Sequence, residues 1–346
     1  MMEQRGGRRR LHRTAMLAAT VVLMFFASVL LGSYTVTIPD FFTIVINHLT
    51  GGPKIPGASF IVMENKLPRA VIGTLIGIAF GLAGALFQTM LRNPLASPDV
   101  IGISSGASVA AVVAIVIFGA SGAAVSGAAL AGALAVAALI HAISRSGRGG
   151  GRGNTAGNRL VLAGVGIAAA LQAVVSFLMT RADIRTAADA LVWLNGSLNS
   201  ANWDRAGILG MALALLLPAV ALVAGPLRIL ELGDDAAAGL GVPVNRARLV
   251  LVVIAVSLAA VATAAAGPVS FVAFLAGPIA RRFTGKASLP ASAFVGALIV
   301  LAADYCAAKL APLLLDGTVL PVGVITGALG APFLLWLLVT ANRKDA

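Results

Sequence analysis

The sequence predicts an all-α fold, a polytopic membrane bundle of about ten transmembrane helices. Of its 346 residues, 59% are hydrophobic and only 11% are charged, whereas a soluble domain carries roughly 25% charged residues. The apolar residues form continuous runs of about 20, the length of a membrane-spanning helix. A membrane barrel would instead show short segments of alternating hydrophobicity. The 39 glycines and the many alanines further favour close packing between helices.

Ten apolar runs give the expected helices. They are placed at 15–33, 68–91, 98–118, 122–143, 159–180, 206–224, 247–266, 269–284, 288–306 and 321–340. The third and eighth runs are short or carry polar breaks, so each could be a tilted or half-span helix. The first run follows a basic tail, residues 1–14, and is long enough to be retained as a span and not cleaved as a signal peptide. Residues 15–340 are therefore expected to form a single transmembrane domain.

The basic residues test this count, because Lys and Arg gather on the cytoplasmic side of membrane proteins. With the N-terminus inside, the cytoplasmic segments hold 18 of the 25 Lys and Arg residues and the outer segments hold 7. Removing one helix would destroy this asymmetry in the rest of the chain. Both tails, 1–14 and 341–346, are therefore expected in the cytoplasm. The net charge of +12 is explained by topology, which argues against a nucleic-acid partner.

The sequence lacks the residues needed for a disulfide, a metal site or a nucleotide-binding loop. Cys306 is the single cysteine, so no intramolecular disulfide can form. His12, His48 and His141 lie far apart without ligand spacing, so no metal site is expected. The glycine-rich segment 144–158 resembles a phosphate loop, but no Gly-Lys-Ser/Thr follows it. The chain is therefore expected to bind no nucleotide or other cofactor directly and not to be an enzyme.

Three loops stand out from the apolar runs. Segment 144–158 is expected to be a flexible cytoplasmic linker. Segment 183–204 lies outside and contains an apolar stretch, 187–194, which is expected to form an amphipathic helix on the membrane surface. Segment 225–248 is cytoplasmic and holds the densest acidic cluster of the chain.

That acidic cluster predicts a short helix. Asp234 and Asp235 follow Gly233 and precede three alanines, so they occupy a first helical turn, where acids suit the helix dipole. Gly239 and Gly241 end the helix, and Pro243 prevents its continuation. The segment could be an ordinary solvated loop with good caps or a helix presented to a cytoplasmic partner. Physical chemistry alone favours neither interpretation.

Polar residues inside or beside the spans carry further alternatives. Arg69, at the outer end of the second run, could pair with a carboxylate of a docking protein or extend to lipid phosphates. Ser104, Ser105 and Gly106 could line a transport pathway or simply allow close packing. Gly73, Gly77 and Gly81, at four-residue spacing, are interpreted as packing positions. Gln172 and Asp304 are functional candidates because polar groups in spans are costly.

Six motifs occur in the order and spacing of one known family. They are Leu67-Pro68-Arg69 with Asn93-Pro94-Leu95-Ala96, Gly102-Ile103-Ser104-Ser105-Gly106-Ala107, Trp193-Leu194-Asn195-Gly196-Ser197-Leu198, Leu232-Gly233-Asp234-Asp235-Ala236-Ala237 with Leu240-Gly241-Val242, Gly267-Pro268-Val269-Ser270-Phe271-Val272 with Ile279-Ala280-Arg281, and Leu320-Pro321-Val322-Gly323-Val324 with Gly330-Ala331-Pro332-Phe333. Together they resemble the permease subunits of bacterial ABC importers for iron-siderophore complexes, haem and cobalamin, the FecCD-like type II importers.

The resemblance implies a function and a set of partners. Such a subunit forms a pathway through the bacterial plasma membrane with a second permease subunit, while two cytoplasmic ATPase subunits use ATP and an extracytoplasmic binding protein delivers the cargo. Residues implied to couple to the ATPase are Glu231, Asp234, Asp235, Gly239 and Gly241. Residues implied to dock the binding protein are Arg69 and Lys309.

Two departures from the family pattern refine these expectations. Many relatives carry an arginine four residues after the aspartate matching Asp304, but this chain has Ala308 there. Lys309 follows it and would point about 100° further round an α-helix, which puts a second docking contact in doubt. In relatives the eighth helix usually reads Pro-His or Pro-Gln before Ile-Ala-Arg, whereas this chain has Gly277-Pro278. The ending 279–284 that follows is similar to subunits of catecholate-siderophore importers that work in unlike pairs, so a heterodimer is favoured.

An iron-siderophore complex is the expected cargo, and haem or cobalamin is the alternative within the same family. An ion-coupled secondary transporter would need ionisable groups at mid-membrane, and the central spans have almost none. A membrane enzyme would need a nucleophile, a base or metal ligands gathered at one depth, and no such set is visible.

Overall fold

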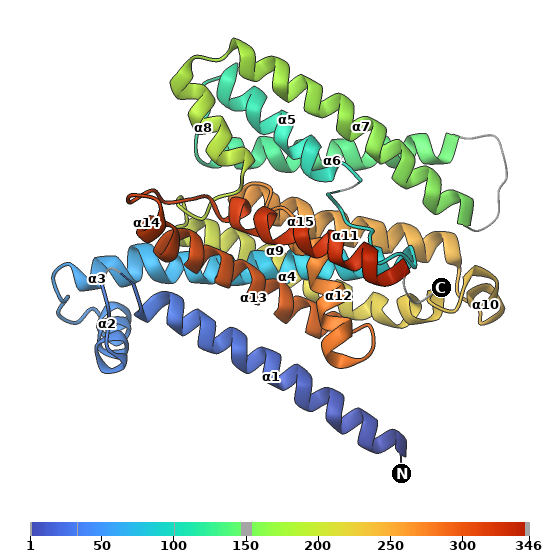
Figure 1. Cartoon of the computed structure of the whole chain (residues 1–346), viewed down its shortest axis with the longest axis horizontal. Helices are drawn as coiled ribbons and strands as arrows, with labels where there is room; N and C mark the ends of the chain where they lie inside the picture. The colour runs from blue at the N-terminus through green and yellow to red at the C-terminus, as the bar shows by residue number, and fades with distance from the viewer. Residues whose placement is uncertain (1, 33, 100, 147–153, 343–346) are drawn as a thin grey trace.

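The computed structural model describes residues 2–32, 34–99, 101–146 and 154–342, and within these ranges it contains helices and no strand (Figure 1). The helices are α1 (Met2–Leu30), α2 (Ile38–Thr50), α3 (Ala58–Phe60), α4 (Leu67–Met90), α5 (Ile103–Val116), α6 (Ala123–Ser146), α7 (Asn154–Arg181), α8 (Ile184–Leu194), α9 (Trp203–Leu230), α10 (Asp234–Gly239), α11 (Val244–Ala266), α12 (Val272–Thr284), α13 (Leu289–Tyr305), α14 (Ala311–Leu314) and α15 (Val322–Asn342). Two π-helical turns, η1 (Ile61–Lys66) and η2 (Cys306–Leu310), join α3 to α4 and α13 to α14.

Each of the ten predicted spans corresponds to a helix of the structure. Among the described residues, seven helices are long and apolar enough to cross a membrane. The third and eighth predicted spans, α5 and α12, have only 14 and 13 residues. At 1.5 Å per residue they are about 20 Å long, shorter than the ~30 Å hydrocarbon core. The expectation of two incomplete spans is therefore confirmed.

The helices extend further than their apolar runs. Helix α1 begins at Met2, so the basic tail 1–14 continues the first span and is not a separate segment. Helix α6 ends at Ser146 and α7 begins at Asn154, so the linker between them is shorter than the predicted 144–158. Residues 147–153 lie outside the described part of the chain. The C-terminal tail is shortened likewise, since α15 ends at Asn342 and 343–346 are not described. Charged and polar helix formers continue a helix beyond the membrane at little cost.

Helix α2 was not predicted, because its 13 residues are too few to span a membrane. Its ends are nevertheless encoded locally. The Thr37 hydroxyl accepts a hydrogen bond from the Asp40 amide, and Gly51 ends the helix with a φ of 72°. The predicted start at Pro68 was also too late, since α3 and η1 run into α4 and form one continuous helix, Ala58–Met90. Pro68, at the start of α4, has no backbone N–H to donate, and the wider π-helical turn η1 lies directly before it.

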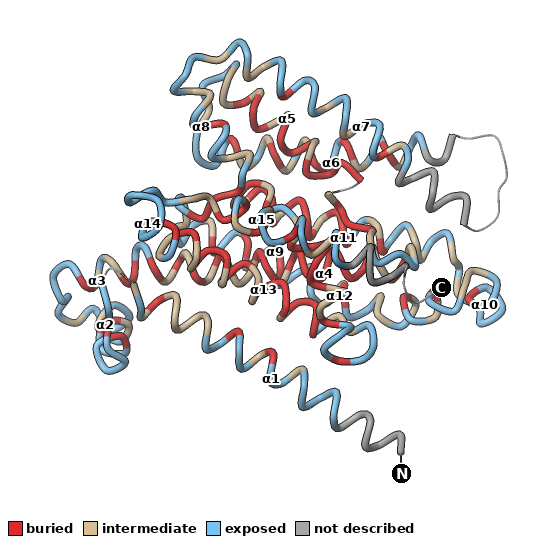
Figure 2. The backbone as a smooth tube through the Cα atoms, viewed as in Figure 1, coloured by how far each residue is buried: buried red, intermediate tan, exposed pale blue. Residues whose placement is uncertain are grey.

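Helix α4 lies at the centre of the molecule, where it contacts α9, α11, α12 and α13 and is mostly buried (Figure 2). Glycines make this possible, as the spacing of Gly73, Gly77 and Gly81 predicts. A Cβ at Gly77 would lie 2.4 Å from the Ala297 Cα, and one at Gly81 would lie 2.3 Å from the Ser292 carbonyl oxygen of α13. The backbones of α4 and α13 therefore touch, which gives dense packing without large side chains.

A second group of helices, α5 to α8, packs against one side of this central bundle (Figure 1). Helix α7 is little covered, and Leu162, Val165, Val174 and Phe177 on it are exposed. Such apolar exposure suits lipid or a second subunit. Gln172, a functional candidate from the sequence, also lies on the exposed surface of α7.

The two ends of the bundle differ in what they carry (Figure 1). The start of α1, the end of α15, α10 and the facing ends of α6 and α7 lie at one end, which we call the α10 end. Helices α2, α3, α8 and α14 lie at the opposite end, the α2 end. This arrangement agrees with the predicted placement of both termini on one side.

Candidate functional site

The α2 end holds an ion pair between a half-buried arginine of α4 and a buried aspartate of α13. Arg69, in the first turn of α4, donates from Nε to Asp304 Oδ2 at 2.8 Å and from Nη2 to Asp304 Oδ1 at 2.8 Å. Its Nη1 donates to the side-chain oxygen of Asn199 at 2.8 Å. The two charged side chains are only 19% and 9% exposed. The bidentate geometry is the strongest form of this interaction.

This pair changes what the sequence suggested for Arg69. Its guanidinium needs neither a carboxylate of another protein nor a lipid phosphate, because Asp304 and Asn199 satisfy it within the chain. Docking of a binding protein at Arg69 stays a prediction. The sequence pointed to Arg69 and Asp304 separately, but at a separation of 235 positions it gave no signal that they meet.

Lys309 lies at the same end on η2, so the predicted step of about 100° for an α-helix does not apply to it. Its aliphatic stem packs over Gly32, where a Cβ would lie 2.5 Å from the Lys309 Cε. Lys66, the last residue of η1, is buried, and its ammonium group donates hydrogen bonds to the backbone carbonyls of Leu31 and Tyr34. The docking role predicted for Lys309 is not tested by these contacts.

Three of the sequence motifs meet at this end through their glycines. A Cβ at Gly196 would lie 2.6 Å from the Pro268 carbonyl oxygen, and one at Gly267 would lie 2.3 Å from the Trp193 carbonyl oxygen. At Gly323 the corresponding distance to the Asn195 carbonyl oxygen is 1.8 Å. Glycine is thus required at each position because backbone approaches backbone directly.

The α10 end carries the predicted short helix. Helix α10 covers Asp234–Gly239, with Asp234 and Asp235 in its first turn, and Gly241 follows with a φ of 82°. The helix, its acidic start and its glycine end are therefore confirmed. The enclosing loop is shorter than the predicted 225–248, because α9 continues to Leu230 and α11 already begins at Val244.

The acidic residues of this segment divide into two kinds. The Asp234 carboxylate lies 3.0 Å from an Arg248 guanidinium nitrogen and 3.7 Å from one of Arg92, and it is 18% exposed. Asp234 therefore ties α10 to the start of α11 and to the residues that follow α4. Asp235 and Glu231 are exposed, although Glu231 lies 3.8 Å from Arg281. Sequence reasoning had treated all three acids alike.

Two exposed leucines flank α10 and were not singled out in the sequence. Leu232 is 67% exposed and Leu240 is 63% exposed, one on each side of the helix. Together with the exposed Asp235, Gly239 and Gly241 they form a small mixed surface at the tip of the α10 end. The signal for them was an apolar residue on each side of an otherwise polar loop.

The three residues predicted to line a pathway or to pack lie at the start of α5. Ser104 is buried and its hydroxyl donates to the carboxylate of Asp99. A Cβ at Gly106 would lie 2.7 Å from the Gly132 carbonyl oxygen of α6, so Gly106 serves close packing. Ser105 is half-buried.

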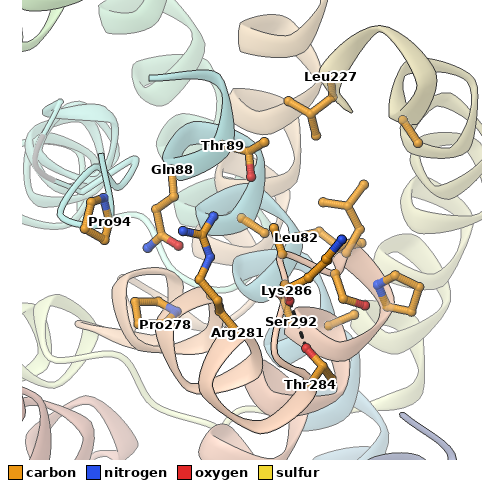
Figure 3. Close-up of a pocket in the computed structure, with 18 of the residues that line it drawn as sticks. Leu82, Gln88, Thr89, Pro94, Leu227, Pro278, Arg281, Thr284, Lys286 and Ser292 are labelled. Carbon is orange, nitrogen blue, oxygen red and sulfur yellow. Dashed lines mark hydrogen bonds between the residues drawn. The ribbon is translucent and has the colours of Figure 1, made fainter. Parts of the chain in front are cut away.

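A cavity of about 1470 Å³ opens at the α10 end between α4, α9, α12 and α13 (Figure 3). Gln88 on its wall donates from its side-chain amide to the Phe274 carbonyl of α12 at 3.0 Å. A Cβ at Gly277 would lie 1.9 Å from the Gln88 side-chain oxygen. A larger residue at position 277 would therefore displace Gln88.

Comparisons with known proteins extend the sequence resemblance. A family model described as the FecCD transport family matches residues 20–340. The chain is 44% identical over 188 residues to the ferric enterobactin transport system permease protein FepG of Escherichia coli K12, with 54% of this chain and 56% of that protein aligned. It is 37% identical over 193 residues to the Fe(3+)-citrate import system permease protein YfmE of Bacillus subtilis, with 54% and 56% aligned. The chain thus spans about half the length of the curated relatives it matches.

Two solved structures share the architecture. One, described as an inward-facing conformation of an ABC transporter assigned to the metal-chelate type, has a TM-score of 0.78 at 24% identity and covers 94% of this chain and 98% of its own. The other, PsaBC from Streptococcus pneumoniae in complex with Fab, has a TM-score of 0.55 at 18% identity and covers 80% and 92%. At these identities the likeness concerns the fold alone.

Proposed function

The chain belongs to the FecCD transport family, and on this basis we propose that it is the permease subunit of an ATP-driven importer for an iron-siderophore complex. Two of its relatives are named for ferric enterobactin and Fe(3+)-citrate, which supports an iron chelate over haem or cobalamin as cargo. The concentration of basic residues at the α10 end supports a cytoplasmic location for that end. The membrane is then the bacterial plasma membrane, and the α2 end faces the binding protein that delivers the cargo.

The observation that carries this proposal is how α10 is presented and held. Its exposed surface, Leu232, Asp235 and Leu240, is free to contact a cytoplasmic ATPase. Its Asp234 connects it to Arg92, directly after the central helix α4. A displacement of α10 by the ATPase would therefore reach α4. Such a link lets nucleotide binding bias the pathway between two conformations.

The permease itself binds no nucleotide in this proposal. Two partner ATPase subunits hydrolyse ATP, and a second, unlike permease subunit completes the pathway. The exposed apolar residues of α7, among them Leu162 and Phe177, support a contact with another membrane protein. Among the described residues no group of three or more His, Cys, Asp or Glu could hold a metal ion.

Co-purification tests the proposal. The tagged full chain is expressed with the ATPase and permease genes of its own transport system and isolated in mild detergent, and ATPase activity is measured in the eluate. We expect the double variant Asp235→Lys, Leu240→Lys to lose the ATPase while it keeps the second permease. The matched control Asp189→Lys, Leu191→Lys removes an exposed acid and an exposed leucine from α8 at the α2 end. Equal ATPase recovery with both variants would contradict the proposed contact.

A further inference from the structure

The cavity at the α10 end reaches deep between the helices. Its wall on α4 runs from Leu82 to Arg92, and its wall on α9 runs from Leu217 to Glu231. At 1.5 Å per residue the α4 wall alone is about 15 Å long. The cavity therefore extends from the end of the bundle to roughly the middle of a ~30 Å bilayer core.

One face of α9 shows how the lining changes with depth. Leu217, Ala221, Ala224 and Arg228 follow one another at three- or four-residue intervals, so they lie on the same side of the helix. The three deeper residues are apolar, and the fourth, nearest the mouth, is charged. Leu217 still lines the cavity although it lies about 16 Å deeper than Arg228 along the helix. The deeper part of this α9 face is thus apolar.

The mouth of the cavity is strongly basic. Six cations line it, namely Arg10, Arg92, Arg228, Arg281, Arg282 and Lys286, against a single acid, Glu231. Figure 3 shows the Arg281 side chain extending toward Gln88, with Lys286 among the side chains that line the same cavity. So many like charges repel one another unless an anion lies between them.

Internal partners neutralise only part of this charge. Arg92 lies 3.7 Å from Asp234, Arg281 lies 3.8 Å from Glu231, and Arg282 stacks over the Trp336 ring at 5.0 Å. Arg228 and Lys286 make no ion pair with any residue that the structure describes. The mouth therefore offers at least two uncompensated cations to a ligand.

We propose that this cavity binds an anionic phospholipid. Its phosphate lies at the mouth against Arg228 and Lys286, and an acyl chain lies along the apolar faces of α9 and α4. The combination of an anion site with an apolar shaft selects an amphiphile. A soluble anion or an acidic peptide would leave the shaft empty or wet, whereas a lipid fills both parts.

Lipid binding to the purified full chain tests this inference. The protein is delipidated in detergent, and retention of phosphatidylglycerol and of phosphatidylcholine is measured by native mass spectrometry over a range of added lipid. We expect phosphatidylglycerol to bind in preference. The variant Arg228→Gln, Lys286→Gln should bind it roughly thirtyfold more weakly, because each basic residue contributes about a fivefold gain. The matched control Arg246→Gln, Lys54→Gln removes the same charges from exposed positions outside the cavity and should bind normally.

A second variant tests the binding of the acyl chain separately from the binding of the headgroup. Ala224→Phe leaves every charge in place and fills the apolar shaft, so it should also abolish the preference for phosphatidylglycerol. Inorganic phosphate is added as a competitor. Loss of the lipid in both variants, with little competition by phosphate, supports the inference. Equal binding of the two lipids, an unaffected Ala224→Phe variant or strong competition by phosphate would overturn it. These readouts do not depend on the cargo or on the ATPase, so they stand or fall apart from the proposed function.

Discussion

The two ends of α4 are held by ion pairs of very different quality. At the α2 end Arg69 and Asp304 form a bidentate pair at 2.8 Å with side chains 19% and 9% exposed. At the α10 end Arg92 and Asp234 approach only to 3.7 Å, and Arg92 is 41% exposed. One end of the central helix is therefore fixed and the other is loosely tethered. In the proposed coupling to an ATPase, movement would therefore enter α4 from the α10 end.

The surroundings of each pair explain the contrast. Asp304 is on α13, whose backbone touches α4 along the glycine contacts at Gly77 and Gly81, so both partners belong to one rigid unit. Asp234 is on a six-residue helix that follows Gly233, whose φ of 111° only glycine adopts easily. A pair between rigid, half-buried partners gains more than a pair between an exposed arginine and a short helix.

The largest expected effect is at the fixed end. Asp304→Ala leaves the half-buried Arg69 guanidinium without its carboxylate, so stability should fall by about 3–5 kcal/mol, as for other buried pairs that lose one partner. Thermal unfolding of the purified protein in detergent measures it. The double variant Arg69→Ala, Asp304→Ala should be much less destabilised, because no unpaired charge remains. If Asp304→Ala alone had the stability of the wild type, the pair would not fix this end of α4.

The next effect concerns the rigid unit itself. Gly77→Ala places a methyl group 2.4 Å from the Ala297 Cα, so α4 and α13 must separate, at a cost of about 1–3 kcal/mol. Gly127→Ala is the matched control, because a Cβ at that helical position meets nothing within 4 Å. The control should be neutral or slightly stabilised by the better helix propensity of alanine. The same thermal unfolding experiment compares the two variants.

A smaller effect on stability, with a larger one on function, is expected at the tethered end. Arg92→Gln removes an exposed, 3.7 Å pair, so the free energy of unfolding should change by less than about 1 kcal/mol. Uptake of a ferric siderophore by cells carrying the variant should nevertheless fall, because α10 loses its connection to α4. Arg246→Gln, at an exposed position of the same end, serves as the control. Unchanged uptake with Arg92→Gln would argue against this tether.

Features written in short stretches of sequence were predicted well. The ten helices follow from apolar runs, the short α5 and α12 from their polar breaks, and α10 from two acids placed between glycines. The four-residue spacing of Gly77 and Gly81 likewise predicted a close helix contact. Each of these depends on neighbours within a few turns of helix, so local composition carries the information.

The sequence alone determined the membrane class, the order of the helices, the placement of both termini at one end of the bundle and the family to which the chain belongs. Only the tertiary structure decided which polar side chains are paired with other residues of the chain and which stay exposed. In the structure Arg69 pairs with Asp304, 235 positions away in the sequence. Asp234 pairs with Arg248, whereas its neighbour Asp235 is exposed. The Gln88 side chain lies against Gly277. A helical pattern states which face a residue is on, but a salt bridge depends on which other helix comes to lie beside that face. That choice is made by the packing of the whole bundle, and it separates the fixed end of α4 from the end that can move.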